Sequence, residues 1–141
     1  MTKLCREAII IRYITETGHI LLVFLFGAFV YGFLEILWRG YTHPSMLLLG
    51  GICFSVIFFL EGKLSHINIF SRCLLYALMI SSLEFIFGLV LNMWLKLDVW
   101  DYSNIPANFL GQICLPFTAL WYLLSLISCK VCEAIRFVFG Q

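Results

Sequence analysis

Four long runs of apolar residues divide this chain, and their length constrains its fold more than any other feature. They cover about residues 19–38, 44–61, 72–95 and 108–128. A helix needs roughly 20 apolar residues to cross the hydrocarbon core of a bilayer. Each run therefore predicts one membrane-spanning helix. The expected fold class is all-α, an integral membrane bundle of four transmembrane helices.

The composition agrees with a chain that lies in lipid. Of the 141 residues, 62% are hydrophobic and 12% are charged, whereas a soluble domain carries about 25% charged residues. The length suits a single transmembrane domain, residues 1–141. The first run lacks a cleavage pattern of small residues, so we interpret it as a retained span. The lipid bilayer is the expected partner, and a net charge of +1 argues against nucleic acid.

Basic residues predict the orientation of the spans, because lysine and arginine gather on the cytoplasmic side. One side of the predicted bundle has only Arg39 and Lys96. The other side collects Lys3, Arg6, Arg12, Lys63, Arg72, Lys130 and Arg136. We therefore expect a multi-pass protein of the cell membrane with both termini cytoplasmic and the Trp100–Ser103 loop outside.

The C-terminal residues 129–141 predict an amphipathic tail. Lys130, Glu133 and Arg136 recur at helical spacing on one face, which suits the headgroup layer. A continuation of the fourth span is equally compatible with the pattern. Cys129 and Cys132 form a single CxxC, which we interpret as buried or interfacial thiols and not as a metal site.

Glu84 points most directly to a function. It lies twelve residues beyond Arg72, which is roughly 18 Å along a helix and near the middle of the bilayer. A charge at that depth costs about 2.5–3.5 kcal/mol and normally faces protein or water. The side chain is too deep to reach the interface, so we expect a functional or proton-linked role. The sequence leaves its protonation state open.

Further polar residues fall in the outer half of the predicted bundle. The candidates for solute or ion binding are Glu84, Glu35, Asn92, Asp101, Asn108 and Gln112. Lipid offers no hydrogen bonds, so these side chains should turn toward one another or toward water. We expect an outward-facing polar cavity with Glu84 as its floor. Trp100, Tyr102 and Ser103 would form a lid or cap over it.

Structural roles compete with binding at several of these positions. Asn92, Asn108 and Gln112 could form hydrogen bonds between helices, and Glu35 could pair with Arg39 at i+4. Elsewhere, Glu61 lies beside Lys63 near the inner surface, so we expect it to be solvated. Pro116, inside the fourth run, predicts a kink.

Small residues at a spacing of four predict tight helix packing. Ala28 and Gly32 have this spacing in the first run, and Gly51 and Ser55 have it in the second. Four helices are few for a complete transport path. We therefore expect self-association or another membrane subunit as a partner.

Four segments carry a resemblance that covers most of the chain. They are YGFLEILWRG (31–40), GGICF (50–54), LEFIFGLVLN (83–92) and WDYSNIPANFLGQICLPF (100–117), followed by Trp121. The chain thereby resembles the bacterial family of ABC transporter permeases of the CmpB-like type. The resemblance implies that the recurring family features fall at Glu35, Glu84, Trp100–Ser103, Asn108, Gly111 and Gln112. After the first span the chain has Trp38-Arg39-Gly40, as in a shorter subgroup of that family.

Three functions fit these observations. The leading hypothesis is a small transporter or channel-like subunit. An enzyme acting on a lipid-like substrate is the second, with Glu35, Glu84 and Asp101 as the candidates for its acid and its base. The third is a structural or regulatory membrane subunit. The sequence has neither a Ser–His–Asp arrangement nor a phosphate loop, so we assign no catalytic residue, no metal and no cofactor.

Overall fold

The computed structural model describes residues 3–140, with side chains from residue 14 onward. The side chains of Lys3, Arg6 and Arg12, and residue Gln141, lie outside this description. Within it, four helices are long and apolar enough to cross a membrane. They are α1 (Lys3–Arg39), α2 (Pro44–Leu64), α3 (Ile69–Gly88) with the π-helical η1 (Leu89–Trp94) after it, and α4 (Leu115–Phe139). The predicted fold class is confirmed.

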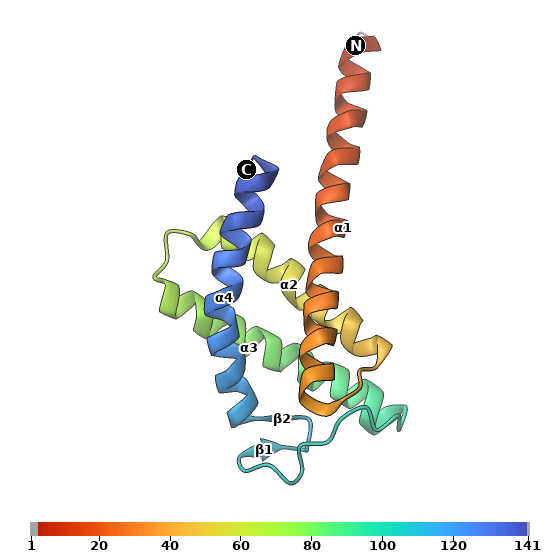
Figure 1. Ribbon diagram of the computed structural model, residues 1–141, viewed down its shortest axis with the longest axis vertical. Coiled ribbons are helices and arrows are strands. Elements are labelled where there is room, and N and C mark those ends of the chain that lie inside the picture. Colours follow the sequence, from red (N-terminus) through yellow and green to blue (C-terminus); the bar gives the residue numbers. More distant parts are fainter. Residues whose placement is uncertain (1–2, 141) are drawn as a thin grey trace.

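The helices cross as an open bundle (Figure 1). The helix α1 descends toward the end that holds the short hairpin of β1 (Asn108–Phe109) and β2 (Ile113–Cys114), and α4 ascends from that hairpin. In chain order between these two helices, α2 rises away from the hairpin and α3 returns to it, so the N- and C-termini lie at the opposite end. We call the end formed by residues 40–43 and 95–114 the hairpin end.

Local capping groups set where α2 and α3 begin. Pro44 occupies the first turn of α2, and the side chain of His43 accepts a hydrogen bond from the Ser45 amide. The side chain of Asn68 accepts one from the Phe70 amide at the start of α3. Both side chains satisfy amides that have no partner within their own helix.

The predicted start of the fourth span at residue 108 is wrong. Residues 108–114 form the antiparallel hairpin, with Asn108 opposite Cys114. Leu110 and Gly111 have φ angles of +52° and +68°, which a right-handed helix does not allow. Pro116 lies in the first turn of α4, where its missing N–H costs nothing, so it begins the helix and does not kink it.

The C-terminal residues continue the fourth span. Helix α4 runs without a break to Phe139, and Gly140 ends it with a φ of +69°. The predicted division at residue 128 is therefore not a structural boundary. Of the two arrangements that the sequence left open, residues 129–139 therefore adopt the one in which they continue the fourth helix.

Glycines let α1 and α2 approach each other closely. A Cβ added to Gly27 would lie 2.9 Å from the backbone oxygen of Gly50. The small residues Gly32 and Gly51, predicted at tight interfaces, contact Leu47 and Phe24 across the same pair of helices. These close contacts form within one copy of the chain.

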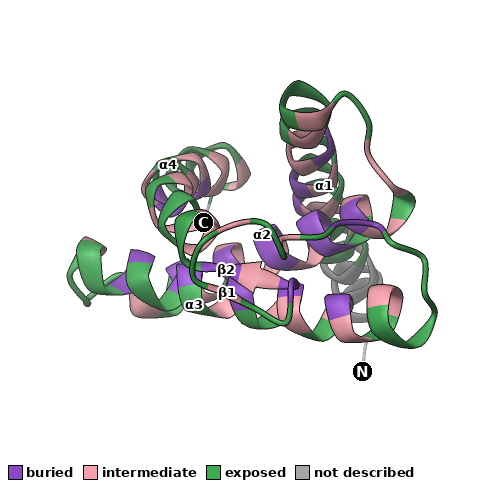
Figure 2. Cartoon of the chain, turned by 90° about the horizontal axis from the view of Figure 1, so that it is seen from below, coloured by how far each residue is buried: buried purple, intermediate pink, exposed green. Residues whose placement is uncertain are grey.

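Most of the buried surface lies on α2 and α3 (Figure 2). In the most apolar window of each span, 44% of α2 and 33% of α3 are buried, against 17% of α1 and of α4. The largest fully buried side chains include Tyr76, Met46 and Leu49. The helices α1 and α4 lie on the same side of α2 and α3 (Figures 1 and 2). They expose wide apolar faces, as expected for surfaces that meet lipid.

Candidate functional site

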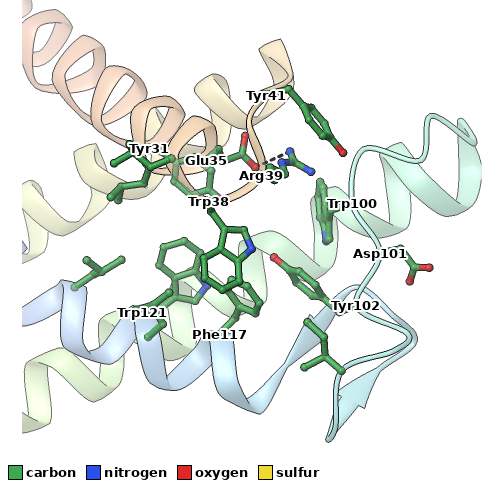
Figure 3. Close-up of a pocket in the computed structure, with 15 residues that line it drawn as sticks. Tyr31, Glu35, Trp38, Arg39, Tyr41, Trp100, Asp101, Tyr102, Phe117 and Trp121 are labelled. Carbon is green, nitrogen blue, oxygen red and sulfur yellow. Dashed lines mark hydrogen bonds and ion pairs between the residues drawn. The ribbon is translucent and has the colours of Figure 1, made fainter.

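A cavity of about 490 Å³ lies between α1 and α4 at the hairpin end (Figure 3). We call it the aromatic cavity. Its lining comprises Tyr31, Leu34, Glu35, Leu37, Trp38, Arg39, Tyr41, Trp100, Asp101, Tyr102, Ile105, Phe117, Leu120, Trp121 and Leu124. The volume lies within the usual range for small-molecule sites, and a mostly apolar wall with few polar groups is also typical of them.

Stacked rings join the two helices around this cavity. Tyr31 of α1 stacks on Trp121 of α4 with ring centroids 5.6 Å apart. Nearer the hairpin, Phe117 stacks on Tyr102 at 4.7 Å and meets the edge of Trp38 at 5.8 Å. Aromatic pairs at these separations are favourable beyond the area they bury. They hold the cavity walls in place although α1 and α4 do not pack closely there.

Glu84 lies behind the wall formed by Tyr31 and Trp121. The indole Nε1 of Trp121 donates to Glu84 Oε2 at 2.8 Å, and the Tyr31 hydroxyl donates to Oε1 at 3.4 Å. The glutamate is 1% exposed and does not itself line the cavity. The expectation that Glu84 forms the exposed floor is thus modified, because two rings stand between its carboxyl group and the open space.

Glu35 lines the cavity as one half of an ion pair. Its two carboxylate oxygens accept hydrogen bonds from Arg39 at 2.7 Å and from the Thr42 hydroxyl at 2.5 Å. Arg39 also donates to the backbone oxygen of Val99 at 2.6 Å and lies over the ring of Tyr41. The pair that the i+4 spacing predicted therefore fastens the end of α1 to the segment that leads into the hairpin.

Asp101 lies at the rim of the cavity, and its carboxylate points away from the rings (Figure 3). It accepts hydrogen bonds from the hydroxyl and the amide of Ser103 at 2.5 and 2.8 Å. These bonds hold the pKa of Asp101 below its usual range. Burial, reinforced by Glu84, raises the pKa of the Tyr102 hydroxyl well above its ordinary value. Tyr102 therefore stays a neutral hydroxyl beside the cavity.

The amide side chains Asn92 and Gln112 form an internal clamp. The Asn92 amide nitrogen donates to Gln112 Oε1 at 2.8 Å and to the Trp100 oxygen at 3.0 Å, while Asn92 Oδ1 accepts from the Val99 amide. Trp100 is 6% exposed and donates its indole N–H to the Gln112 backbone oxygen. Neither amide lines the aromatic cavity.

Asn108 serves the loop and not the cavity. Its amide nitrogen donates to the Ile105 oxygen at 2.8 Å, and its oxygen accepts from Gly111 at 3.2 Å. The predicted convergence of six polar residues is therefore divided in space. Glu35 and Asp101 line the cavity, Glu84 stands behind its wall, and the three amide side chains hold the hairpin end together.

A second cavity, of about 140 Å³, continues the space between α1 and α4 on the side away from the hairpin end, and we call it the deep cavity. It shares Tyr31, Leu34, Trp121 and Leu124 with the aromatic cavity. Its other lining residues are mainly apolar, among them Phe26, Ile57 and Ile80. The two cavities together form an aromatic region near the hairpin end with an apolar extension along the helices.

A second polar cluster, which the sequence analysis missed, lies between α2, α3 and α4. Glu61 is 3% exposed and pairs with Arg72, and it accepts a hydrogen bond from the Tyr76 hydroxyl at 2.7 Å. The expectation that Glu61 is solvated is wrong. Arg72 and Tyr76 stand one turn apart on α3, a spacing that could have indicated a shared partner for Glu61. We call this group the Glu61 cluster.

Thiols complete the Glu61 cluster. Cys129 Sγ lies 3.6 Å from Glu61 Oε2 and 3.9 Å from Cys73 Sγ. The five cysteines from Cys53 to Cys132 are free and buried, as expected for Cys129 and Cys132, whereas Cys5 lies outside the residues with described side chains. Among residues 14–140, no three His, Cys, Asp or Glu side chains are arranged to hold a metal ion.

Comparison with known proteins relates this architecture to a family. No match was found among solved structures. The model of the family described as "Putative ABC-transporter type IV", of the CmpB type, matches residues 23–139. That range contains the aromatic cavity, the hairpin and both buried glutamates, and it extends to the end of α4. The chain therefore belongs to this family of multi-pass membrane proteins.

Proposed function

We propose that this chain is a membrane subunit of a transporter and that it binds a solute in the aromatic cavity. The main support is one observation: both rings that separate Glu84 from the cavity, Tyr31 and Trp121, donate hydrogen bonds to that buried carboxyl group. A buried ionisable group within a span commonly marks a solute or ion path. Here it stands directly behind the wall of an open space of about 490 Å³.

We further propose that the hairpin end faces the outside of the cell and that both termini are cytoplasmic. Lys63 lies in the last turn of α2 and Arg136 in the last turn of α4. Both helices run away from the hairpin (Figure 1), in agreement with the bias of basic residues toward the cytoplasm. Arg72, which contributed to that bias, is buried against Glu61, so its position has a structural explanation as well. The remaining basic residues still favour this orientation.

The proposal includes association with further membrane subunits or with other copies of the chain. Membership of a transporter family agrees with assembly in a complex. The aromatic cavity lies between α1 and α4, which expose most of their apolar surface. A neighbouring subunit that covers these faces would enclose the path from the side.

A structural or regulatory subunit is the second candidate, favoured by the clamp of Asn92 and Gln112. Their hydrogen bonds are made within the chain, as in polar residues that only join helices. The two candidates differ over access to the aromatic cavity. A binding site must admit solutes from water, whereas a purely structural contact need not.

Cysteine labelling from the outer face tests the proposal. Leu120→Cys places a thiol on the cavity wall, and Leu123→Cys places one a turn away on α4, outside both linings. Intact cells are treated with the membrane-impermeant reagent sulfonatoethyl methanethiosulfonate or its trimethylammonium-ethyl counterpart. We expect at least one of them to label Leu120→Cys and to leave Leu123→Cys unmodified. Failure of both at Leu120→Cys would refute an outward-facing cavity.

A further inference from the structure

The walls of the aromatic cavity are built mainly from aromatic side chains. Those that line it are Tyr31, Trp38, Tyr41, Trp100, Tyr102, Phe117 and Trp121. The face of an aromatic ring carries negative charge and attracts cations, most strongly when water is excluded. An anion brought against the same faces would be repelled. The wall therefore discriminates between ligands by the sign of their charge.

Glu84 strengthens this discrimination from behind. The Trp121 indole N–H and the Tyr31 hydroxyl both donate to it, and a ring that donates its polar hydrogen to a carboxylate becomes richer in electrons. Among residues with described side chains, no lysine, arginine or histidine forms an ion pair with Glu84. In its ionised form Glu84 has no cationic partner among these residues, so a cation in the neighbouring space would be the group that stabilises that form.

The remaining charges at the cavity also favour a cation. Arg39 lines the wall, but its two terminal nitrogens are engaged by Glu35 and by the Val99 oxygen. Asp101 adds a carboxylate at the rim that no described basic residue pairs with. Glu35 and Arg39 thus neutralise each other at the cavity wall, and the Asp101 carboxylate, which points away from the rings (Figure 3), leaves the rim without a positive charge of its own.

We propose that the aromatic cavity takes a bulky organic cation, such as a quaternary ammonium or phosphonium ion, against the ring surfaces that Tyr31 and Trp121 turn toward the open space. This inference rests on the proposed function, because it requires a cavity that is open to solutes. The apolar lining of the deep cavity, which shares these two rings, accommodates a hydrocarbon substituent of the same ligand. A small inorganic cation is disfavoured, since the wall offers few oxygen atoms to replace its water.

Ligands matched in shape and different in charge test the proposal. Tetraphenylphosphonium, neutral triphenylphosphine oxide and anionic tetraphenylborate are titrated into the full chain in nanodiscs, with empty nanodiscs as background. The protein carries Trp94→Phe, because Trp94 lies outside both linings, so fluorescence reports on the three tryptophans of the cavity. We expect the cation to bind at least tenfold more tightly than the neutral compound. The fluorescence change caused by the anion should not saturate.

Two variants separate the role of Glu84 from that of the cavity shape. Glu84→Gln should weaken binding of tetraphenylphosphonium about tenfold or more and leave triphenylphosphine oxide nearly unchanged. Trp121→Phe keeps a ring on the wall and removes the N–H that donates to Glu84. This variant should weaken binding of the cation several-fold and leave binding of the neutral compound unchanged. It tests the role of Glu84 even if Glu84→Gln does not fold.

The outcomes distinguish this inference from the proposed function. Equal affinity for the cation and the neutral compound would overturn the inference and leave the binding cavity standing. Saturable binding of the anion alone would also overturn the inference without removing the binding cavity. If none of the three binds while Leu120→Cys is labelled from outside, the organic cation is the wrong ligand class. If Leu120→Cys is not labelled from outside, the outward-facing cavity of the proposed function has failed, whatever the ligand.

Discussion

The two buried glutamates of this protein have different partners. Glu61 and Glu84 are 3% and 1% exposed, so both are removed from water. Glu61 pairs with the guanidinium of Arg72 and accepts from Tyr76. Glu84 accepts only from the neutral side chains Tyr31 and Trp121. The carboxylate of Glu61 is therefore neutralised inside the protein, whereas the carboxyl group of Glu84 has no cationic partner among the described residues.

Their surroundings differ in the same way. No residue of the Glu61 cluster lines either cavity, whereas both partners of Glu84 line the aromatic cavity. A buried ion pair is costly to break by removal of one partner. A carboxyl group without a cationic partner beside an open space can attract a ligand. The contrast teaches that burial alone does not identify a functional glutamate. The two glutamates differ instead in the identity of their partners and in the access of those partners to open space.

The largest expected effect comes from breaking the ion pair of the Glu61 cluster. Arg72→Met removes the positive charge and leaves Glu61 buried without a cationic partner. Breaking a buried pair in this way costs about 3–5 kcal/mol. We expect a loss of unfolding free energy of that order, measured in mixed micelles with an increasing fraction of dodecyl sulfate.

The double variant Glu61→Gln/Arg72→Met is the matched control. With both charges removed, the penalty of an unpaired buried charge disappears, so most of the lost stability should return. If Arg72→Met is as stable as the unchanged chain, the Glu61 cluster does not hold the helices together. A structural role for Glu61 would then no longer distinguish it from Glu84.

A smaller loss is expected at the amide clamp. Asn92→Ala leaves the Val99 amide and the side-chain oxygen of Gln112 without the hydrogen bonds that Asn92 provides. Leaving buried polar groups unsatisfied costs about 1–3 kcal/mol. We expect a destabilisation in this range, together with faster hydrogen exchange at the Val99 amide. Unchanged exchange at Val99 would show that the clamp does not order the hairpin end.

Glu84→Gln should affect stability less than either of these changes. The amide keeps an oxygen that can accept from Trp121, so about one hydrogen bond is lost, and such bonds in membranes are worth roughly 0.6 kcal/mol. The same unfolding experiment measures this difference. A loss as large as that of Arg72→Met would place Glu84 among the structural residues and remove the contrast with Glu61.

Much of the fold could be predicted because lipid imposes a simple requirement. A span must be long, apolar and helical, and the four runs of the sequence meet that requirement. The position of Glu84 within the third span followed from counting residues. Its proximity to Tyr31 and Trp121, which lie 53 and 37 residues away, depends on how three helices cross. Periodicity within one helix does not contain that information.

The hairpin was missed because hydropathy does not distinguish an apolar strand from an apolar helix. Residues 108–114 include Phe109, Leu110, Ile113 and Cys114, so in a hydropathy window they continue the apolar run of α4 in spite of Asn108 and Gln112. The positive φ angles at Leu110 and Gly111 and the Asn92–Gln112 contact decide its structure. One local signal was available: Pro116 favours the first turn of a helix over its interior. The burial of Glu61 was missed because its partner Arg72 lies on the next helix, 11 residues away, and hydropathy does not indicate such a pair.

The smallest effect is expected at Asp101, a carboxylate that is exposed where both glutamates are buried. Hydrogen bonds from Ser103 lower its pKa, so the folded state favours the ionised form. The resulting stabilisation is complete above the unfolded pKa of about 4 and is lost as the pH falls through the lower folded-state pKa. An NMR titration should therefore show the Ser103 amide signal moving only below about pH 4, and the signal should be insensitive to pH there in Asp101→Asn. Because water screens this exposed group, the change should remain confined to the Asp101–Ser103 turn. If signals of residues that line the aromatic cavity also shifted in this pH range, ionisation of Asp101 would be coupled to the structure of the cavity, and the rim would not be independent of the wall in front of Glu84.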